Sequence, residues 1–271
     1  MGEKETQEKR TEPKRKASLL RALPVAFSLY SRIPMPRFVW RSQDMAYHLI
    51  YFPLVGLVIG VLLVLWQRLC LALSLSPLTF SLVGTALPLL LTGGFHFDGY
   101  LDTLDAIHSY GDREKKLAIM DDPHVGAFAL VHGLVFCLLY SAGLSVLAAD
   151  TKGICCAAAG FVLSRALSGL AVVTLPSAKT GGMLQTFART AQKRAVRGAL
   201  LAELLAASAL LLWYAPLSGS LVLAACLITF FAYRRYALHT YQGITGDLAG
   251  WFVTLAELLM VLAAACGSLL N

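Results

Sequence analysis

Long uncharged stretches dominate the pattern of polar and apolar positions along this chain. Four of them, residues 45–67, 69–97, 123–149 and 204–233, contain no Asp, Glu, Lys or Arg. A membrane-spanning helix needs about 20 apolar residues. Within lipid, each spanning segment must satisfy its own backbone hydrogen bonds, which a helix does. The pattern therefore predicts an all-α fold, a polytopic bundle of membrane helices.

Breaks within and between these stretches divide the chain into about seven spans, with an uncertainty of one. Pro216 and Gly219 interrupt the longest stretch and predict a tight helical hairpin there. The predicted spans are residues 45–67, 78–97, 125–148, 154–175, 198–214, 217–233 and 249–268.

Composition narrows the protein class further. Hydrophobic residues make up 57% of the 271 residues and charged residues only 14%, with a formal net charge of +7. These values exclude a disordered chain, a disulfide scaffold and an ordinary soluble enzyme. The basic residues are not clustered with aromatics between them, which argues against a nucleic-acid partner. The six cysteines form no CxxC pair and are interpreted as small apolar core residues.

The distribution of positive charge predicts the orientation of the bundle. With the N-terminus in the cytoplasm, 20 of the 23 lysines and arginines fall on the cytoplasmic side. The C-terminus then lies outside. Residues 1–20 are expected to form a disordered cytoplasmic tail, and residues 21–271 a single integral membrane domain. Within that domain, the prolines and arginines of 31–37 suggest that residues 21–44 approach the membrane in a non-helical, interfacial form.

Half of the 16 acidic residues fall at the predicted cytoplasmic face. Asp98, Asp102 and Asp105 are spaced i, i+4, i+7, which places three carboxylates on one face of a helix. Such like charges repel one another, and a divalent cation would relieve the repulsion. Mg²⁺ typically binds one or two carboxylates together with substrate phosphates. The alternative is a solvated helix end, but an acidic cluster next to a membrane helix is costly without a role.

Two neighbouring positions extend this candidate site. His96 could act as a base or an orienting group, although a lone histidine is more often structural. Asp121 and Asp122 precede the third span, where an acid could cap the helix N-terminus. That role is compatible with metal binding by Asp122.

A third segment, Gly243, Thr245, Gly246 and Asp247, precedes the last span. Glycines let backbone N–H groups approach a ligand, and a helix start favours anions. These residues are candidates for substrate binding, with a helix-capping role for Asp247 as the alternative.

Arg165 lies in the middle of a span, where an unpaired charge costs at least about 2.5 kcal/mol. It could clamp a substrate phosphate, or it could pair with Glu203 or Glu257. Together these residues predict a Mg²⁺-suited cytoplasmic site for transfer of a phosphate-linked group.

At these segments the sequence resembles the cobalamin synthase (adenosylcobinamide-GDP ribazoletransferase) family. The matching segments are SRIPMP (31–36), FPLVGLVIG (52–60), TGGFHFDGYLDTLD (92–105), LAIMDDPHVG (117–126), Ser164-Arg165 and GITGD (243–247). They occur in the family's order from about residue 21 to the C-terminus.

The resemblance implies the last step of adenosylcobalamin biosynthesis, with Mg²⁺ as cofactor, at the cytoplasmic face of a bacterial inner membrane. A hydroxyl of α-ribazole, or of its 5′-phosphate, attacks adenosylcobinamide-GDP and GMP leaves. The roles that follow are metal binding by Asp98, Asp102 and Asp122, and catalysis by Asp105 with His96. Substrate binding falls to Arg165, Gly243, Thr245, Gly246 and Asp247.

Two other functions remain open from the sequence. The DGxxDxxD pattern is also similar to the CDP-alcohol phosphatidyltransferase motif, so a lipid-headgroup transferase is the first alternative. A membrane transporter is the second, but the acids gather at one interface and no internal repeat is visible. The sequence does not decide whether the chain forms a homo-oligomer.

Overall fold

The computed structural model describes residues 18–36 and 38–270, and the regular secondary structure of this part of the chain is helical. It forms eleven α-helices and two short 3₁₀ helices, and the described residues contain no β-strand. The elements are α1 (Leu19–Tyr30), η1 (Ser42–Met45), η2 (His48–Tyr51), α2 (Phe52–Ala72), α3 (Pro77–Thr92), α4 (Phe95–His108), α5 (Arg113–Met120), α6 (Ala127–Val146), α7 (Thr151–Thr174), α8 (Gly182–Thr190), α9 (Lys193–Tyr214), α10 (Pro216–Tyr241) and α11 (Gly246–Leu269). The expected all-α helix bundle is confirmed.

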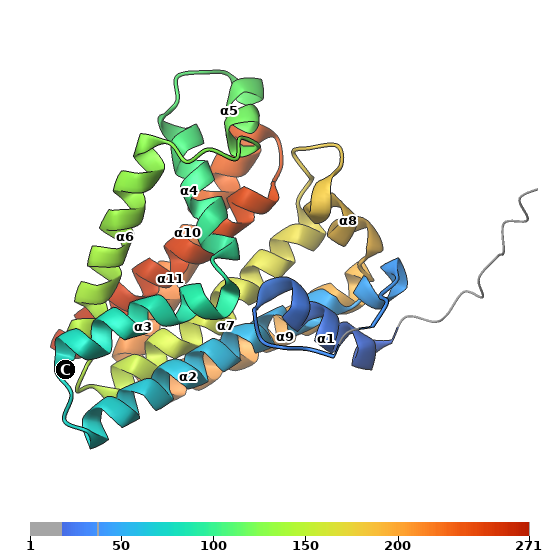
Figure 1. Ribbon diagram of the computed structural model, residues 1–271. Coiled ribbons are helices and arrows are strands. Elements are labelled where there is room, and N and C mark those ends of the chain that lie inside the picture. The colour runs from blue at the N-terminus through green and yellow to red at the C-terminus, as the bar shows by residue number, and fades with distance from the viewer. Residues whose placement is uncertain (1–17, 37, 271) are drawn as a thin grey trace, which may run out of the picture.

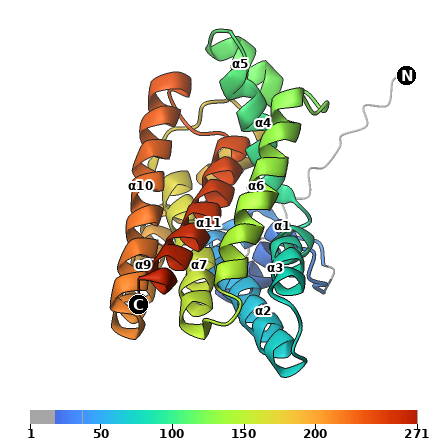
Figure 2. The ribbon, with the colours of Figure 1, turned by 90° about the vertical axis from the view of Figure 1, so that its left-hand side faces the viewer.

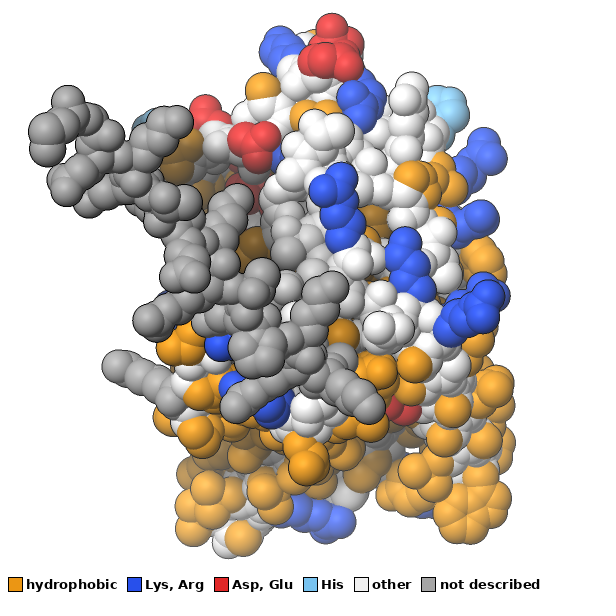
Figure 3. Space-filling view, turned by 90° about the vertical axis from the view of Figure 1, so that its right-hand side faces the viewer, with side chains coloured by type: hydrophobic (Ala, Val, Ile, Leu, Met, Phe, Trp, Pro, Cys, Tyr) orange, Lys and Arg blue, Asp and Glu red, His pale blue; other side chains and the backbone are white. Residues whose placement is uncertain are grey.

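Helix α7 forms the centre of the bundle. It packs against α2, α9, α10 and α11 (Figure 1), and most of its residues are buried. The outer helices α2, α6 and α9 instead carry many exposed leucines and valines. One face of the molecule is accordingly almost entirely hydrophobic in its lower half, whereas Lys and Arg gather above it (Figure 3). This surface is typical of a protein whose outer helices contact lipid.

The number of spans agrees with the sequence to within the expected uncertainty. Among the described residues, six helices are long and apolar enough to cross a membrane, and a bent pair, α3 and α4, raises the number to seven if it is one span. The hairpin predicted at Pro216 is present as the turn between α9 and α10. The boundaries shift by a few residues, most at α10, which continues to Tyr241 rather than ending near 233.

The predicted span 78–97 is wrong as a single straight helix. Helix α3 ends at Thr92, and α4 begins at Phe95 after a bend of 97°. Gly93 and Gly94 both adopt left-handed backbone conformations, with φ of 67° and 76°. Only glycine adopts this region without a steric cost, so the two consecutive glycines allow the sharp turn. As a result α4 rises away from α3 (Figure 1).

The segment before the first span also differs from the expectation. Residues 21–44 were expected to be non-helical, but Leu19–Tyr30 form α1, because apolar residues recur there at helical spacing and bury one face. Residues 31–36 are non-helical as expected, and the Arg32 backbone N–H donates to the Leu91 carbonyl at 2.7 Å. The predicted disordered tail lies almost entirely in residues 1–17, outside the described residues.

The two ends of the bundle differ in composition. The turns α2–α3, α6–α7 and α9–α10 lie at one end, near the end of α11, while α5 and the α10–α11 turn lie at the other (Figure 2). The latter end carries the acids of α4, α5 and the loop 121–122.

Glycine spacing explains the close contact between α2 and α7. Gly56 and Gly60 lie one turn apart on α2 and face the backbone of α7. A Cβ atom at Gly60 would lie 2.8 Å from the Ala158 carbonyl oxygen, and one at Gly56 would collide with the Phe161 carbonyl oxygen. Small residues one turn apart let membrane helices approach closely, and here they bring the outer helix onto the central one.

Replacing Gly56 with Ala is therefore expected to lower the free energy of unfolding by about 1–3 kcal/mol, since the rigid backbone of α7 would have to move. The measurement is thermal unfolding of the purified protein in detergent. Gly198→Ala on α9 is the matched control, because a Cβ there meets no atom within 4 Å. Equal melting temperatures for the two variants would contradict close packing at Gly56.

Candidate active site

The acidic face of α4 is the starting point of the candidate site. Asp98 is exposed, and Asp102 and Asp105 are half-buried, while Gly99 and Thr103, which flank the acidic face, are buried. The predicted spacing on one helical face is confirmed. Helix α4 packs against α6 and α11, so the acidic face is bordered by both helices.

A close crossing of α4 and α11 brings a fourth carboxylate to this face. A Cβ atom at Gly99 would lie 2.7 Å from the Asp247 Cα atom, and one at Gly250 would lie 2.8 Å from the His96 carbonyl oxygen. Both positions therefore require the absence of a side chain. The crossing places Asp247 close enough to Asp102 for their charges to interact.

Lys179 and Asp121 complete the arrangement from two further segments. The Lys179 ammonium lies 2.7 Å from Asp121 Oδ1 and 3.8 Å from Asp247 Oδ2. It also acts electrostatically on Asp102, as do Asp98 and Asp105. We call Asp98, Asp102, Asp105, Asp121, Asp247 and Lys179 the acid cluster. Four segments that are distant in sequence contribute to it.

Backbone hydrogen bonds join the loop of residues 176–178 to the loop of residues 243–244 beside the acid cluster. The Ile244 N–H donates to the Pro176 carbonyl, and the Ala178 N–H donates to the Ile244 carbonyl, both at 2.9 Å. Gly243 fits against residues 176–178 only because it lacks a side chain. The Arg113 side chain of α5 then donates to the Tyr241 carbonyl at 2.9 Å and to the Ala178 carbonyl at 2.6 Å. These bonds hold Lys179 and Asp247 on a common, ordered support.

The start of α11 lies next to these loops and is capped by its own residues. Thr245 is the N-cap, and its hydroxyl accepts a hydrogen bond from the Leu248 N–H at 3.1 Å. The N-cap role considered for Asp247 is therefore wrong, and its carboxylate lies beside its own backbone N–H and the Thr245 hydroxyl. A side chain at Gly246 would meet no atom within 4 Å. A ligand could therefore approach this backbone.

Asp105 is held differently from the other carboxylates. Its oxygens accept hydrogen bonds from the Gly126 N–H at 2.7 Å and the Ala129 N–H at 2.9 Å. These donors belong to the first turn of α6 and the residue before it, where backbone N–H groups have no partner within the helix. Asp105 thus caps α6 from another helix and fixes the α5–α6 loop beside α4.

The paired acids at 121 and 122 face different partners. Asp122 accepts hydrogen bonds from the His124 backbone N–H at 2.9 Å and from the His124 imidazole at 2.6 Å. These bonds lower the pKa of Asp122. Asp121, by contrast, contacts Lys179 and so belongs to the acid cluster.

The chemistry of the donors suits a hard divalent cation. Asp98, Asp105 and Asp247 are near enough to Asp102 to repel its charge, and a cation would relieve this repulsion. Within the described ranges, no group of three or more His, Cys, Asp or Glu side chains is already arranged to enclose a metal ion.

The structure places His96 away from the acid cluster. Its ring is buried and packs on Tyr30, Phe52 and Phe95, with centroid separations of 5.3–6.4 Å. Its Nδ1 atom has no hydrogen-bond partner in the described structure. This setting favours the structural role of His96 over a catalytic one.

Arg165 is likewise in the core rather than at the cluster. It is 1% exposed, and its Nη1 lies 2.5 Å from Glu257 Oε1 and 3.0 Å from the Phe161 carbonyl oxygen. Of the two acids considered as its partner, Glu257 is confirmed. With its charge already paired inside the bundle, Arg165 does not serve as a free phosphate clamp in this structure.

Known proteins are similar to this chain over most of its length. A family model described as cobalamin-5-phosphate synthase matches residues 22–265. A Lachnoclostridium phytofermentans protein named adenosylcobinamide-GDP ribazoletransferase is 40% identical over 244 residues, covering 90% of this chain and 93% of the relative. Relatives of the same name from Pseudomonas savastanoi (36% identical) and Desulfitobacterium hafniense (35%) each cover 90% of the chain and 97% and 96% of themselves. No solved structure matches it.

The chain belongs to the cobalamin-5-phosphate synthase family. The resemblance noted from the sequence motifs is thereby confirmed. The structure places the family motifs of residues 92–105 and 243–247 side by side, through the crossing of α4 and α11.

Lys179 and Arg113 are site residues of this family member that sequence reasoning missed. Arg113 lies in a short charged segment and Lys179 is a lone charge in a loop, and a basic residue is expected at either place on the cytoplasmic side for orientation alone. Neither has a spacing pattern that sets it apart. Their partners come from segments 58 to 128 residues away, so only the tertiary structure reveals them.

Removing one partner of the Arg165–Glu257 pair should strongly destabilise the protein. We expect Arg165→Met or Glu257→Leu to lower the free energy of unfolding by about 3–5 kcal/mol, because each leaves an unpaired buried charge. The double variant should recover much of this loss. The measurement is a double-mutant cycle of thermal stability, and additive losses would contradict the pairing.

Asp105→Asn should cost about 1–2 kcal/mol of stability, because an amide replaces a carboxylate that caps α6. Asp98→Asn is the matched control on the same helix face, and should leave the melting temperature unchanged or higher, since it removes a repelling charge. If Asp105→Asn were as stable as Asp98→Asn, Asp105 would not act as a cap.

Proposed function

We infer that this chain catalyses the final step of cobalamin biosynthesis, the transfer of ribazole to adenosylcobinamide-GDP. Its membership in a family whose members are named adenosylcobinamide-GDP ribazoletransferase supports the activity. The observation that carries the site assignment is the acid cluster, where the crossing of α4 and α11 brings Asp247 near Asp98 and Asp102 at the start of α11. Family membership disfavours the lipid-headgroup transferase and the transporter.

The reaction replaces one phosphorus–oxygen bond by another. A hydroxyl oxygen of α-ribazole, or of its 5′-phosphate, bonds to the cobinamide-side phosphorus of adenosylcobinamide-GDP. The bond from that phosphorus to the bridging oxygen breaks, and GMP leaves with the bridging oxygen. The hydroxyl proton passes to a base. The protein must therefore hold a diphosphate, orient a hydroxyl and accept a proton.

The residues of the acid cluster divide these tasks. We assign Mg²⁺ binding to Asp98 and Asp102, one turn apart on α4. Mg²⁺ bound there supplies charge neutralisation at the diphosphate. The first turn of α11 at Gly246, with Lys179 beside it, attracts the phosphate groups. Because Asp105 is occupied as a cap, we assign proton acceptance to Asp247 rather than to Asp105.

Other residues support the site without touching the reacting atoms. Asp105 positions the start of α6, Thr245 caps α11, and Gly243 allows the contact of the two loops. Asp122 orders its own loop through His124. His96 and Arg165 pack inside the bundle behind the acid cluster.

We further propose that the acid cluster faces the cytoplasm across the inner membrane of a bacterium. The excess of Lys and Arg at the same end of the bundle supports this orientation. Adenosylcobinamide-GDP and α-ribazole would then reach the acid cluster from the side where nucleotides are present.

Single Asn substitutions at three carboxylates should separate the assigned roles. Asp98→Asn and Asp102→Asn should each lower the turnover about 100-fold and raise the Mg²⁺ concentration needed for half-maximal activity. Asp247→Asn should lower the turnover with the Mg²⁺ requirement unchanged. The measurement is GMP release from adenosylcobinamide-GDP and α-ribazole in membranes, with Gly198→Ala as an unaffected control. Near-normal turnover in all three variants would refute the assignment.

A further inference from the structure

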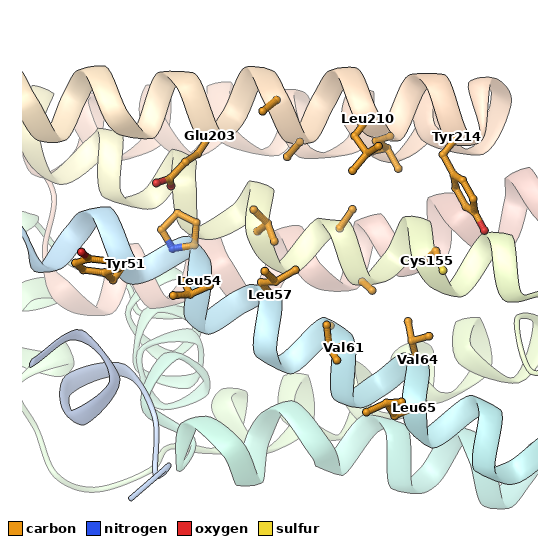
Figure 4. Close-up of a pocket in the computed structure, with 18 of the residues that line it drawn as sticks. Tyr51, Leu54, Leu57, Val61, Val64, Leu65, Cys155, Glu203, Leu210 and Tyr214 are labelled. Atoms are coloured by element: carbon orange, nitrogen blue, oxygen red, sulfur yellow. The ribbon is translucent and has the colours of Figure 1, made fainter. Parts of the chain in front are cut away.

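A second, apolar site lies away from the acid cluster. It is a groove of about 810 Å³ between α2 and α9, with α7 as its floor (Figure 4). Leu57 and Val61 of α2 and Leu210 of α9 form its walls, and Ala158 of α7 lies at its base. Its volume is in the range of sites for one small ligand, of roughly 300–1,000 Å³.

One carboxylate interrupts this apolar lining. Glu203 projects from α9 into the end of the groove where Tyr51 also lies (Figure 4). It is half-buried, its Oε2 atom is inaccessible to solvent, and that atom has no hydrogen-bond partner in the described structure. A buried carboxylate oxygen without a donor is costly. Elsewhere in the bundle this cost is met by pairing, as for Glu257 with Arg165.

Glu203 lies along α9 at the depth expected for the headgroups of membrane lipids. Lys193, Arg194 and Arg197 are exposed in the preceding turns, and no charged residue follows Glu203 until Arg234. From Glu203 to Tyr214, at the far end of the groove, α9 extends about 16 Å. That length suits an extended hydrocarbon chain with its polar group at Glu203.

We propose that this groove binds one phospholipid with a primary ammonium headgroup. The ammonium donates to the Glu203 carboxylate, the lipid phosphate lies toward the basic first turns of α9, and one acyl chain fills the groove between α2 and α9. A primary ammonium carries N–H donors for the unsatisfied oxygen, which a quaternary choline lacks. A phosphatidylglycerol headgroup offers no cation.

A second copy of the chain fits this groove less well. An isologous contact centred on it would bring two Glu203 carboxylates together, with no described basic side chain in the groove to separate them. The groove is also too small for a whole helix, whose diameter with side chains is about 10–12 Å.

The test is lipid retention by the full chain purified in detergent and measured by native mass spectrometry. The probes are phosphatidylethanolamine, phosphatidylcholine and phosphatidylglycerol with identical palmitoyl and oleoyl chains. We expect the unmodified protein to retain phosphatidylethanolamine about tenfold better than the other two. Glu203→Gln should abolish this preference, and Ala207→Phe, which fills the groove wall, should lower the retention of all three.

Ala209→Phe is the matched control, because Ala209 is exposed on the same helix and does not line the groove. It should bind lipid as the unmodified protein does, and melting temperatures identify any variant that fails to fold. Equal retention of the three lipids by the unmodified protein, or an unchanged preference in Glu203→Gln, would overturn the proposal. So would a dimer, detected in the same spectra, that Ala207→Phe dissociates. The assay measures no transfer chemistry, so its outcome is independent of the proposed reaction.

Discussion

A charged side chain buried away from water is costly unless it is paired, and this constraint determines where the charges of the bundle lie. Inside the bundle it is met by the contact of Arg165 with Glu257, which joins the central helix α7 to α11. The remaining acids of the described chain lie mostly at the end that carries α5, where ions, water and substrate can balance them. The distribution of charge thus separates a structural interior from a chemical surface.

The acid cluster depends on backbone geometry as much as on charge. The left-handed turn at Gly93 and Gly94 redirects the chain by 97°, so that α4 can cross α11 instead of continuing the line of α3. The crossing is close because Gly99 and Gly250 leave room for the opposing backbones. Loops held by Arg113 then bring Lys179 to the same place. A site for a charged substrate is therefore supported by rigid helices and fastened loops, which suits a reaction that depends on positioning.

Both candidate sites contain carboxylates whose charge needs compensation, and the compensating group differs between them. In the acid cluster, several carboxylates lie close together, and a divalent cation that also binds the diphosphate would neutralise their charge. In the groove, a single carboxylate lies among apolar side chains and calls for one donor attached to a hydrocarbon chain. Ligands from water and from the lipid phase would thus bind the same chain at separate surfaces.

The sequence by itself determined the helical membrane class, the approximate spans and the acidic face of α4, because these depend on hydropathy and on spacing within one segment. It also indicated the family, through motifs that are continuous in the chain. It did not determine the bend after Thr92, since a run of apolar residues reads as one helix whether or not glycines turn it. Nor could it distinguish a capping carboxylate, Asp105, from its neighbours Asp98 and Asp102, or choose Glu257 over Glu203 as the partner of Arg165. Those distinctions rest on contacts between segments far apart in the sequence, and only the packing of α4, α6, α7 and α11 decided them.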